Sequence, residues 1–582
     1  MGQKQSLEIQ GKPVERVGVI IVHGIGEQKR FEFLEGETRK IVNAIIHNYG
    51  ARRRDVTPVL KTGTGDSYLG NQSSWASGGL APLHAMVELP DKIVDIAFHE
   101  VWWADINEKL TLGKQFRFWL WGLSLPGIPT RKDRILPGAS ERTRLPEHAG
   151  WLPWYNRWRM AFVSMLFGLS AFSIAFINMI LKRLDFSPLL STDVLVNYLS
   201  GVKLYGQDKR AGGSPMDGPD EPPRAAIRRR MIRVMVDVAQ RGYDRWYILA
   251  HSLGTVVAWN GLMEIERTLP NYLDQECWDA LANCPLRAVN PTDFDINAMM
   301  PNRPVWVGAR DIISRDALFE KFRGVLTYGS PLERFCALWS PMVPINDAED
   351  PFRVGTEWIN VYDPTDPVAT WVYDFNPKTT TPTRPGHTKL KPHNFPCRSS
   401  RILLYSHICY LKNPRTDALD GKDFLVNQAA HWLITGESLA DSIKNATRNQ
   451  TSFWMPSSSA RQQTEWDVRW RRRLRAIQDV VVGVALLALT LLSLNYVIYP
   501  LAKGTLGLVG ASSVSSALSK FLVGWLPNSM GYRVLAETGV LLGITAAVVA
   551  GSSWILYVRW TKQHDRFKSH FAKQSALTPH HP

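Results

Sequence analysis

Residues 245–258 have the sequence Arg-Trp-Tyr-Ile-Leu-Ala-His-Ser-Leu-Gly-Thr-Val-Val-Ala, and this stretch decides the fold. The apolar run 246–250 predicts a buried strand, and the pattern over 255–268 predicts a helix. Between them lies a tight turn with Ser252 at its centre. A strand, a sharp turn around a serine and a helix are the context of a nucleophile elbow, in which the turn lifts the serine hydroxyl above the sheet. The usual pattern is G-x-S-x-G, and here Ala250 replaces the first glycine.

A second apolar run, residues 17–23, predicts another central strand, because strands buried on both faces are apolar without interruption. It ends in His23-Gly24-Ile25-Gly26. Glycines at such a position let backbone N–H groups turn towards a ligand. The segment lacks the lysine of a P-loop and the G-x-G-x-x-G of a dinucleotide site, so a phosphate loop is not favoured. His23 itself is expected to stabilise the turn.

Strands and helices alternate along the chain, which predicts an α/β domain with a mostly parallel sheet. Helical patterns cover 35–49 and 225–241. Strand patterns at 324–331 and 358–369 each end in a turn, and the second of these turns carries two aspartates. A short apolar run within 401–410 is followed by a histidine.

Taken together, these motifs resemble those of the lipase-like serine esterases of the α/β-hydrolase superfamily, over roughly residues 15–435. The resemblance implies an α/β-hydrolase fold, with helices on both faces of the sheet, and the chain order serine, acid, histidine. The motifs that carry it are Val22-His-Gly-Ile-Gly26, Leu249-Ala-His-Ser-Leu-Gly254, Thr327-Tyr-Gly-Ser-Pro331, Tyr362-Asp-Pro-Thr-Asp-Pro-Val368 and Ser406-His407.

The resemblance also implies a role for each catalytic residue. Ser252 would be the nucleophile, His407 the base that activates it, and Asp366 the acid that holds the base in the right tautomer. The oxyanion donors would be backbone N–H groups of Gly24, Ile25 and Leu253. The implied activity is hydrolysis of an acyl ester, with no cofactor and no metal.

Alternatives remain open for two of these roles. Asp363 lies nearer the strand end than Asp366 and is the rival acid. His387 and His393, in the preceding loop, are the rival bases. A second hypothesis of a different class is a catalytically inactive hydrolase-like domain that serves as an interaction or scaffold module.

Amino-acid composition and charge favour some classes of binding partner over others. The chain has 582 residues and a net charge of +15, with five cysteines that form no C-x-x-C pair. No disulfide framework is expected, and the sequence contains no zinc-finger spacing and no RNA-binding motif. Basic residues lie beside apolar stretches, which favours an anionic membrane surface over nucleic acid. A lipid or other acyl ester is the expected substrate, and the sequence predicts no specific protein partner.

Three apolar stretches, 160–181, 480–502 and 535–558, are long enough to span a bilayer. The first separates the glycine turn from the serine elbow, so a membrane-embedded element that does not cross is predicted there. The other two predict a C-terminal transmembrane hairpin. Their basic outer flanks place the hydrolase domain of an integral membrane protein on the cytoplasmic side. The predicted organisation is a tail (1–14), a hydrolase domain (15–440) with a membrane-associated insertion (110–205), a basic linker (441–475), the hairpin (476–560) and a basic tail (561–582).

Overall fold

The computed structural model describes residues 8–9, 11–24, 31–46, 59–64, 82–106, 205, 223–290, 303–333, 352–363, 384–396 and 424–441, with single positions and short runs between 335 and 411 and between 550 and 562. The chain divides into two compact units. One contains Met1–Glu108 and Ser200–Arg473, and the other contains Lys109–Leu199 and Leu474–Pro582. The sheet and the candidate site belong to the first unit.

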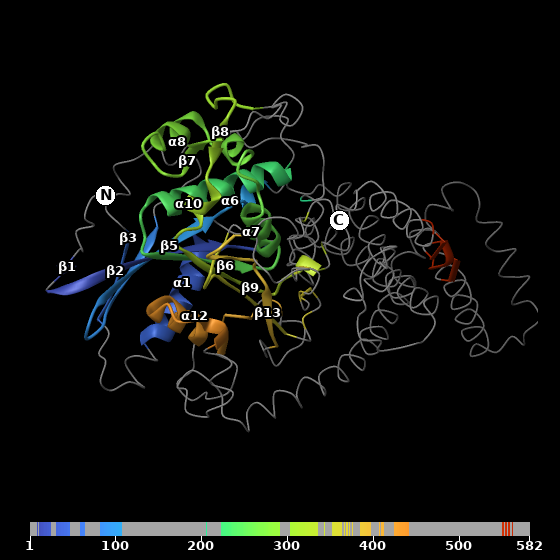
Figure 1. The fold of residues 1–582 in the computed structure, drawn as a ribbon. Coiled ribbons are helices and arrows are strands. Elements are labelled where there is room, and N and C mark those ends of the chain that lie inside the picture. The colour runs from blue at the N-terminus through green and yellow to red at the C-terminus, as the bar shows by residue number, and fades with distance from the viewer. Residues whose placement is uncertain are drawn as a thin grey trace, which may run out of the picture. The chain divides into compact units, whose positions relative to one another are not determined.

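Nine strands of the described residues form one mixed sheet (Figure 1). They are β1 (Glu8–Ile9), β2 (Lys12–Val22), β3 (Val59–Thr64), β4 (Leu83–Glu88), β5 (Ile93–Val101), β6 (Arg245–His251), β9 (Phe322–Tyr328), β11 (Glu357–Tyr362) and β13 (Pro392–Pro396). In the order β13-β11-β9-β6-β2-β5-β4-β3, the neighbours from β13 to β5 pair in parallel. Strands β3, β4 and β1 add antiparallel pairs. The prediction of a mostly parallel α/β sheet is therefore confirmed.

Helices cover both faces of this sheet (Figure 1). On one face α1 (Glu32–Ile45) packs against α12 (Phe424–Thr435). On the other face α6 (Pro223–Gln240) packs against α7 (Gly254–Leu262). The shorter elements are η3 (Ala104–Ile106), η7 (Leu269–Tyr272), α8 (Gln275–Ala280), α10 (Arg315–Leu318) and two small sheets, β7 (Arg287–Val289) with β8 (Asp311–Ile313) and β10 (Phe352–Arg353) with β12 (His387–Thr388).

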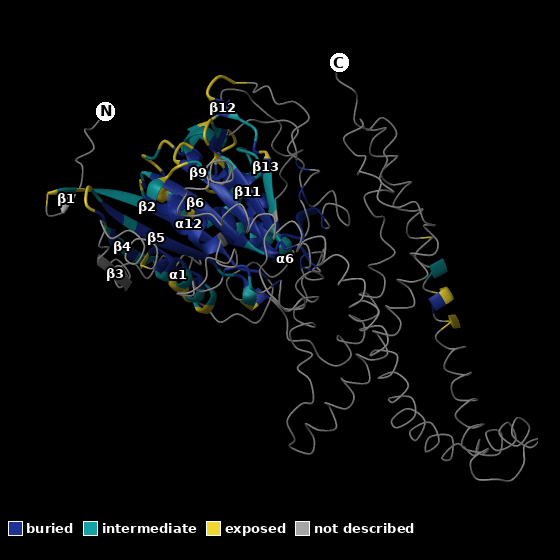
Figure 2. Cartoon of the chain, turned by 90° about the horizontal axis from the view of Figure 1, so that it is seen from below, coloured by how far each residue is buried: buried dark blue, intermediate teal, exposed yellow. Residues whose placement is uncertain are grey.

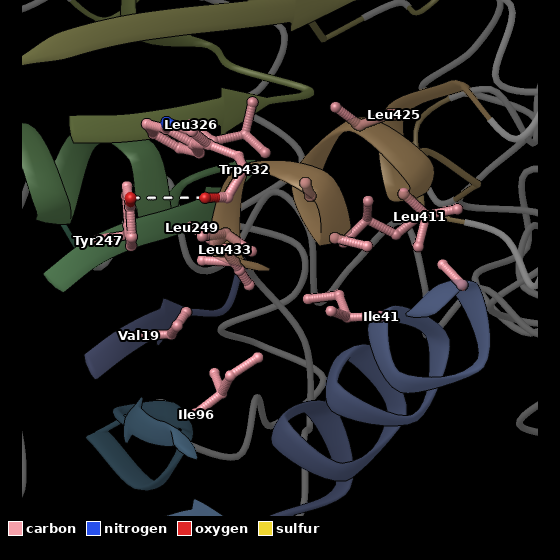
Figure 3. Packing of buried hydrophobic residues seen from close by; sticks show 14 of the residues in the cluster. Val19, Ile41, Ile96, Tyr247, Leu249, Leu326, Leu411, Leu425, Trp432 and Leu433 are labelled. Atoms are coloured by element: carbon pink, nitrogen blue, oxygen red, sulfur yellow. Dashed lines mark hydrogen bonds between the residues drawn. The ribbon is translucent and has the colours of Figure 1, made fainter. Parts of the chain in front are cut away.

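The central strands are buried on both sides, as Figure 2 shows for β6, β9 and β11. Their side chains alternate between two apolar layers because successive residues of a strand point to opposite faces. Figure 3 shows one layer, where Ile41 of α1 and Trp432 of α12 face Val19 of β2 and Leu249 of β6. The Tyr247 hydroxyl also donates to the Trp432 carbonyl at 3.5 Å. Complete burial of each such side chain contributes about 1.5–3 kcal/mol.

The carboxyl ends of the parallel strands meet at one edge of the sheet. Val22 pairs with Ala250, and Ala250 pairs with Thr327. The chain leaves β2 for α1 on one face, and it leaves β6 for α7 on the other. Adjacent strands whose connections diverge in this way open a crevice where α/β proteins bind ligands. The serine elbow and the glycine turn both lie at this position.

Among the residues that the structure describes, no helix is long and apolar enough to cross a membrane. A span needs about 20 consecutive apolar residues in one helix, whereas α6, with 18 residues, is the longest described helix and carries several arginines. This finding contradicts the predicted transmembrane hairpin (476–560) and the membrane-inserted part of the fold. It equally contradicts the integral-membrane localisation with a cytoplasmic hydrolase domain. The ranges 160–181 and 480–502, and most of 535–558, lie outside the described residues.

Candidate active site

Ser252 occupies the strained turn that the elbow pattern predicts. Its φ angle is +52°, a left-handed backbone conformation that residues other than glycine rarely adopt. Such strain costs on the order of 1–3 kcal/mol and persists only where the surroundings impose it. Here the Ser252 N–H donates to the Tyr328 carbonyl at 3.1 Å, and the Ser252 carbonyl accepts from the Thr255 N–H at 3.0 Å and the Thr255 hydroxyl at 2.7 Å. The turn is therefore held from β9 and from α7.

Two glycines allow the close packing around this turn. A Cβ on Gly254 would lie 2.4 Å from the His23 carbonyl oxygen and 2.5 Å from that of Val22. A Cβ on Gly24 would lie 2.6 Å from the Ser252 Cβ. The first residue of α7 thus touches the end of β2, and the glycine turn touches the nucleophile. By contrast, Ala250 is a buried strand residue whose methyl group fits the core, so this position does not require glycine.

His407 connects Ser252 to Asp366. Its Nε2 lies 2.9 Å from the Ser252 Oγ, and its Nδ1 lies 2.9 Å from the Asp366 Oδ2. An ionised carboxylate can only accept, so Nδ1 carries the hydrogen and Nε2 presents a lone pair to the serine hydroxyl. That is the tautomer in which a histidine can act as a general base.

Asp366 is 1% exposed and is surrounded by donors. Its Oδ2 accepts from His407 and from the Tyr410 hydroxyl, the latter at 2.7 Å, and its Oδ1 accepts from the Val368 N–H at 2.7 Å. Burial by itself raises the pKa of a carboxyl group. Here the hydrogen bonds from His407, Tyr410 and Val368 outweigh it and lower the pKa of Asp366. The acid is therefore held ionised and in one orientation.

The predicted oxyanion donors are partly described. Leu253 directly precedes α7, and N–H groups at the start of a helix have no carbonyl partner within the helix. They point to a place where negative charge is stabilised. Gly24 lies against the serine side chain. Ile25 lies outside the described residues.

His23 stabilises the glycine turn, as predicted. The Trp103 N–H donates to its Nε2 at 3.1 Å, so its Nδ1 carries the hydrogen and donates to the Gly24 carbonyl at 2.7 Å. The ring stacks on Trp103 at a centroid distance of 5.0 Å. Burial lowers the pKa of His23 to about 4, which keeps the ring neutral.

His251, next to the nucleophile, contacts the base from below the turn. Its Nε2–H donates to the His407 carbonyl at 2.9 Å, and its ring stacks on Tyr328. Burial, and then the neighbouring His407 ring, lowers the pKa of His251 to about 3. A neutral ring with Nε2 protonated thus ties the backbone of the base to the strand that carries Ser252.

The rival residues lie in other settings. The carboxylate that binds His407 is that of Asp366, whereas the backbone N–H of Asp363 donates to the Tyr410 hydroxyl at 2.8 Å. His387 lies on β12, with its Nε2 3.0 Å from Asp316 Oδ1. His393 lies on the edge strand β13.

Two site residues were not foreseen from the sequence. Tyr410 binds the acid, and Thr255 holds the Ser252 carbonyl and also bonds the Ser330 hydroxyl at 2.9 Å. Thr255 could have been noticed because a hydroxyl three residues after the elbow can reach back one turn. Tyr410 gave no signal, since its partner is 44 residues away. The described residues include no cluster of three or more His, Cys, Asp or Glu that could hold a metal ion.

Comparison with known proteins adds no further constraint. No family model matches the chain, and neither the search of curated proteins nor the search of solved structures found a match.

Proposed function

We propose that the chain is a serine hydrolase that cleaves an acyl ester through an acyl-enzyme intermediate. The observation that supports this most is the continuous hydrogen-bonded chain from the Ser252 hydroxyl through His407 to Asp366, with both links at 2.9 Å. A histidine that only fills space in the core would not need hydrogen bonds to both a serine hydroxyl and a carboxylate. The strained backbone of Ser252, which follows the carboxyl end of β6 in the parallel part of the sheet, supports the same proposal.

In the proposed reaction His407 takes the Ser252 proton while the serine oxygen attacks the ester carbonyl. The tetrahedral oxyanion is bound by the N–H groups of Leu253 and of the glycine turn at Gly24. His407 then gives its proton to the leaving alcohol, which departs and leaves an ester on Ser252. Water, deprotonated by His407, attacks this ester and releases the carboxylic acid, and the proton returns to the serine.

The substrate class in this proposal is an acyl ester. The expectation of a lipid depended on a membrane location, and the described helices do not support that location. The proposal therefore specifies neither the leaving alcohol nor the acyl chain, and the acyl chain is varied in the experiment below.

The test is hydrolysis of p-nitrophenyl esters with acyl chains of increasing length by the purified full chain. We expect turnover that is lost in Ser252→Ala. The matched control is Ser330→Ala, which removes a buried serine hydroxyl bonded to Thr255 and to the Leu332 N–H but outside the proposed triad. This control should lose about 1 kcal/mol of stability and retain turnover. A folded wild-type chain that hydrolyses none of the esters, at any chain length, would favour the inactive scaffold instead.

A further inference from the structure

We propose that Tyr410 is a positioning residue for the acid of the site, one that sets how strongly Asp366 polarises His407. The inference rests on the proposed function and deepens it. It assigns to one hydroxyl the control of the pH at which the site becomes active.

The direction of both Tyr410 hydrogen bonds follows from the geometry. The Asp363 backbone N–H can only donate, and it lies 2.8 Å from the Tyr410 hydroxyl oxygen, which therefore accepts. The single hydroxyl hydrogen remains for the Asp366 Oδ2 at 2.7 Å, an oxygen that can only accept when ionised.

The hydroxyl thereby bridges both ends of the loop that carries the acid. The Asp366 N–H also donates to the Asp363 carbonyl at 2.9 Å, which closes the same loop from within. Tyr410 lies only three residues after His407, so one short segment supplies the base and the clamp on its acid. The Tyr410 ring is 3% exposed and packs within 6.3 Å of His251 and 6.1 Å of Tyr328, centroid to centroid.

Tyr410 and His407 donate to the same oxygen, Oδ2. Two donors on one oxygen share its electron density, so the hydroxyl weakens the attraction between Asp366 and a protonated His407. The hydroxyl also restrains the position of Oδ2, the oxygen that binds the imidazole. Removing it should strengthen the bond between the acid and the base, favour the protonated base at rest, and loosen the acid loop.

The experiment compares Tyr410→Phe with wild type in the full chain. The rate of Ser252 labelling by a fluorophosphonate is measured from pH 5 to pH 9, and labelling is mapped by mass spectrometry. In Tyr410→Phe we expect the pH of half-maximal labelling to rise by about half a unit or more. The maximal rate should fall about tenfold, as expected for loss of a hydrogen bond to a charged group.

A second readout does not depend on reactivity. Proton NMR follows the downfield resonance of the His407 Nδ1–H, which is assigned by its loss in His407→Gln. This resonance should move further downfield in Tyr410→Phe, because the remaining bond to Asp366 becomes stronger.

The matched control is Tyr328→Phe. Tyr328 is a buried neighbour of the same kind, and its hydroxyl donates to Glu37 at 3.2 Å and not to the proposed acid. This control should be destabilised to a similar extent but leave the half-maximal pH and the resonance in place. If Tyr410→Phe does not fold, 3-fluorotyrosine at position 410 replaces it. Its more acidic hydroxyl is the stronger donor, and both shifts should then reverse sign.

The outcomes separate the two proposals. If the wild type labels at Ser252 and Tyr410→Phe moves neither the half-maximal pH nor the resonance, the role of Tyr410 is refuted while the hydrolase proposal stands. If the resonance moves but no form of the protein labels at Ser252, the positioning role stands and the hydrolase proposal fails.

Discussion

Replacing Asp366 with asparagine removes one charge and keeps the size of the side chain, so it tests the acid without creating a cavity. In the native site Oδ2 accepts from His407 and Tyr410, and Oδ1 accepts from the Val368 N–H. An asparagine amide has only one acceptor oxygen. With that oxygen towards Val368, its NH2 group faces Nδ1 and forces the hydrogen of His407 onto Nε2. With the oxygen towards His407, two N–H groups oppose each other at Val368.

The first orientation is the less costly one, because Val368 has a fixed backbone N–H and the imidazole can change tautomer. The histidine then has no lone pair at Nε2 for the serine hydroxyl. From this loss of the base we expect the rate of ester hydrolysis to fall by about 10³- to 10⁴-fold. The corresponding loss of transition-state stabilisation is about 4–5.5 kcal/mol.

The assay is kcat and KM for a p-nitrophenyl ester, measured for wild type, Asp366→Asn and Asp363→Asn, with thermal unfolding as the check on folding. The loss should fall on kcat and leave KM nearly unchanged, because the acid does not touch the ground-state substrate. Asp363→Asn should retain activity, since the carboxylate 2.9 Å from His407 Nδ1 is that of Asp366 and the Asp363 backbone N–H that donates to Tyr410 is unchanged. A folded Asp366→Asn within tenfold of wild type, or a larger loss in Asp363→Asn, would refute the assignment of the acid.

Three further predictions concern the surroundings of the site. Gly254→Ala should lower the free energy of unfolding by about 1–3 kcal/mol, because its Cβ would lie 2.5 Å from the Val22 carbonyl oxygen. The control is Gly36→Ala in α1, where a Cβ meets nothing within 4 Å. This control should raise the free energy of unfolding by about 0.5–1 kcal/mol, and urea unfolding measures both variants. The pKa of His23 is lowered from 6.5 to about 4, so its stabilising contribution is complete above pH 6.5 and is lost as the pH falls towards 4. Between these two pH values His23 should contribute about 1.4 kcal/mol per pH unit to the fall in the free energy of unfolding. A His23→Gln variant whose free energy of unfolding falls as steeply with decreasing pH as that of wild type would contradict this. His387→Gln should leave ester turnover unchanged, since the His387 ring binds Asp316. Loss of turnover in a folded His387→Gln variant would make His387 a candidate base again.

The elbow and the central strands could be predicted from the sequence because their signals are local. The apolar run at residues 246–250 falls within β6, the run at 17–23 ends one residue beyond β2, and the helical pattern at 225–241 matches α6 to within two residues. Burial on both faces leaves no alternative composition for such strands. The elbow turn between β6 and α7 could be recognised because Ala250, Ser252 and Gly254 lie within five consecutive positions, although the atoms that leave no room for a side chain at Gly254 belong to the distant residues Val22 and His23.

Features set by distant contacts could not be predicted in this way. The helix expected over 255–268 ends at Leu262, because the Arg315 guanidinium caps the Leu262 carbonyl and the Glu266 carboxylate binds the Arg315 N–H. Tyr410 is a similar case, since its partners lie in a loop that only folding brings to it. Among 14 histidines, the choice of His407 depended on chain order, which the geometry then supports.

The membrane prediction went wrong for a different reason. Hydropathy of a window measures composition alone, whereas a span also requires one continuous helix of about 20 residues. Of the range 535–558 the structure describes only positions from Ala550 onwards, and among the described residues no helix is long and apolar enough to meet this requirement.

The reactivity of Ser252 tests the central proposal most directly. The folded full chain is treated with a fluorophosphonate, and the modified residue is identified by peptide mass spectrometry. We expect one adduct, on Ser252, which is abolished by prior heat unfolding and by His407→Gln and is retained in Ser330→Ala. Absence of an adduct on Ser252 in the folded protein, or equal labelling in His407→Gln, would contradict it.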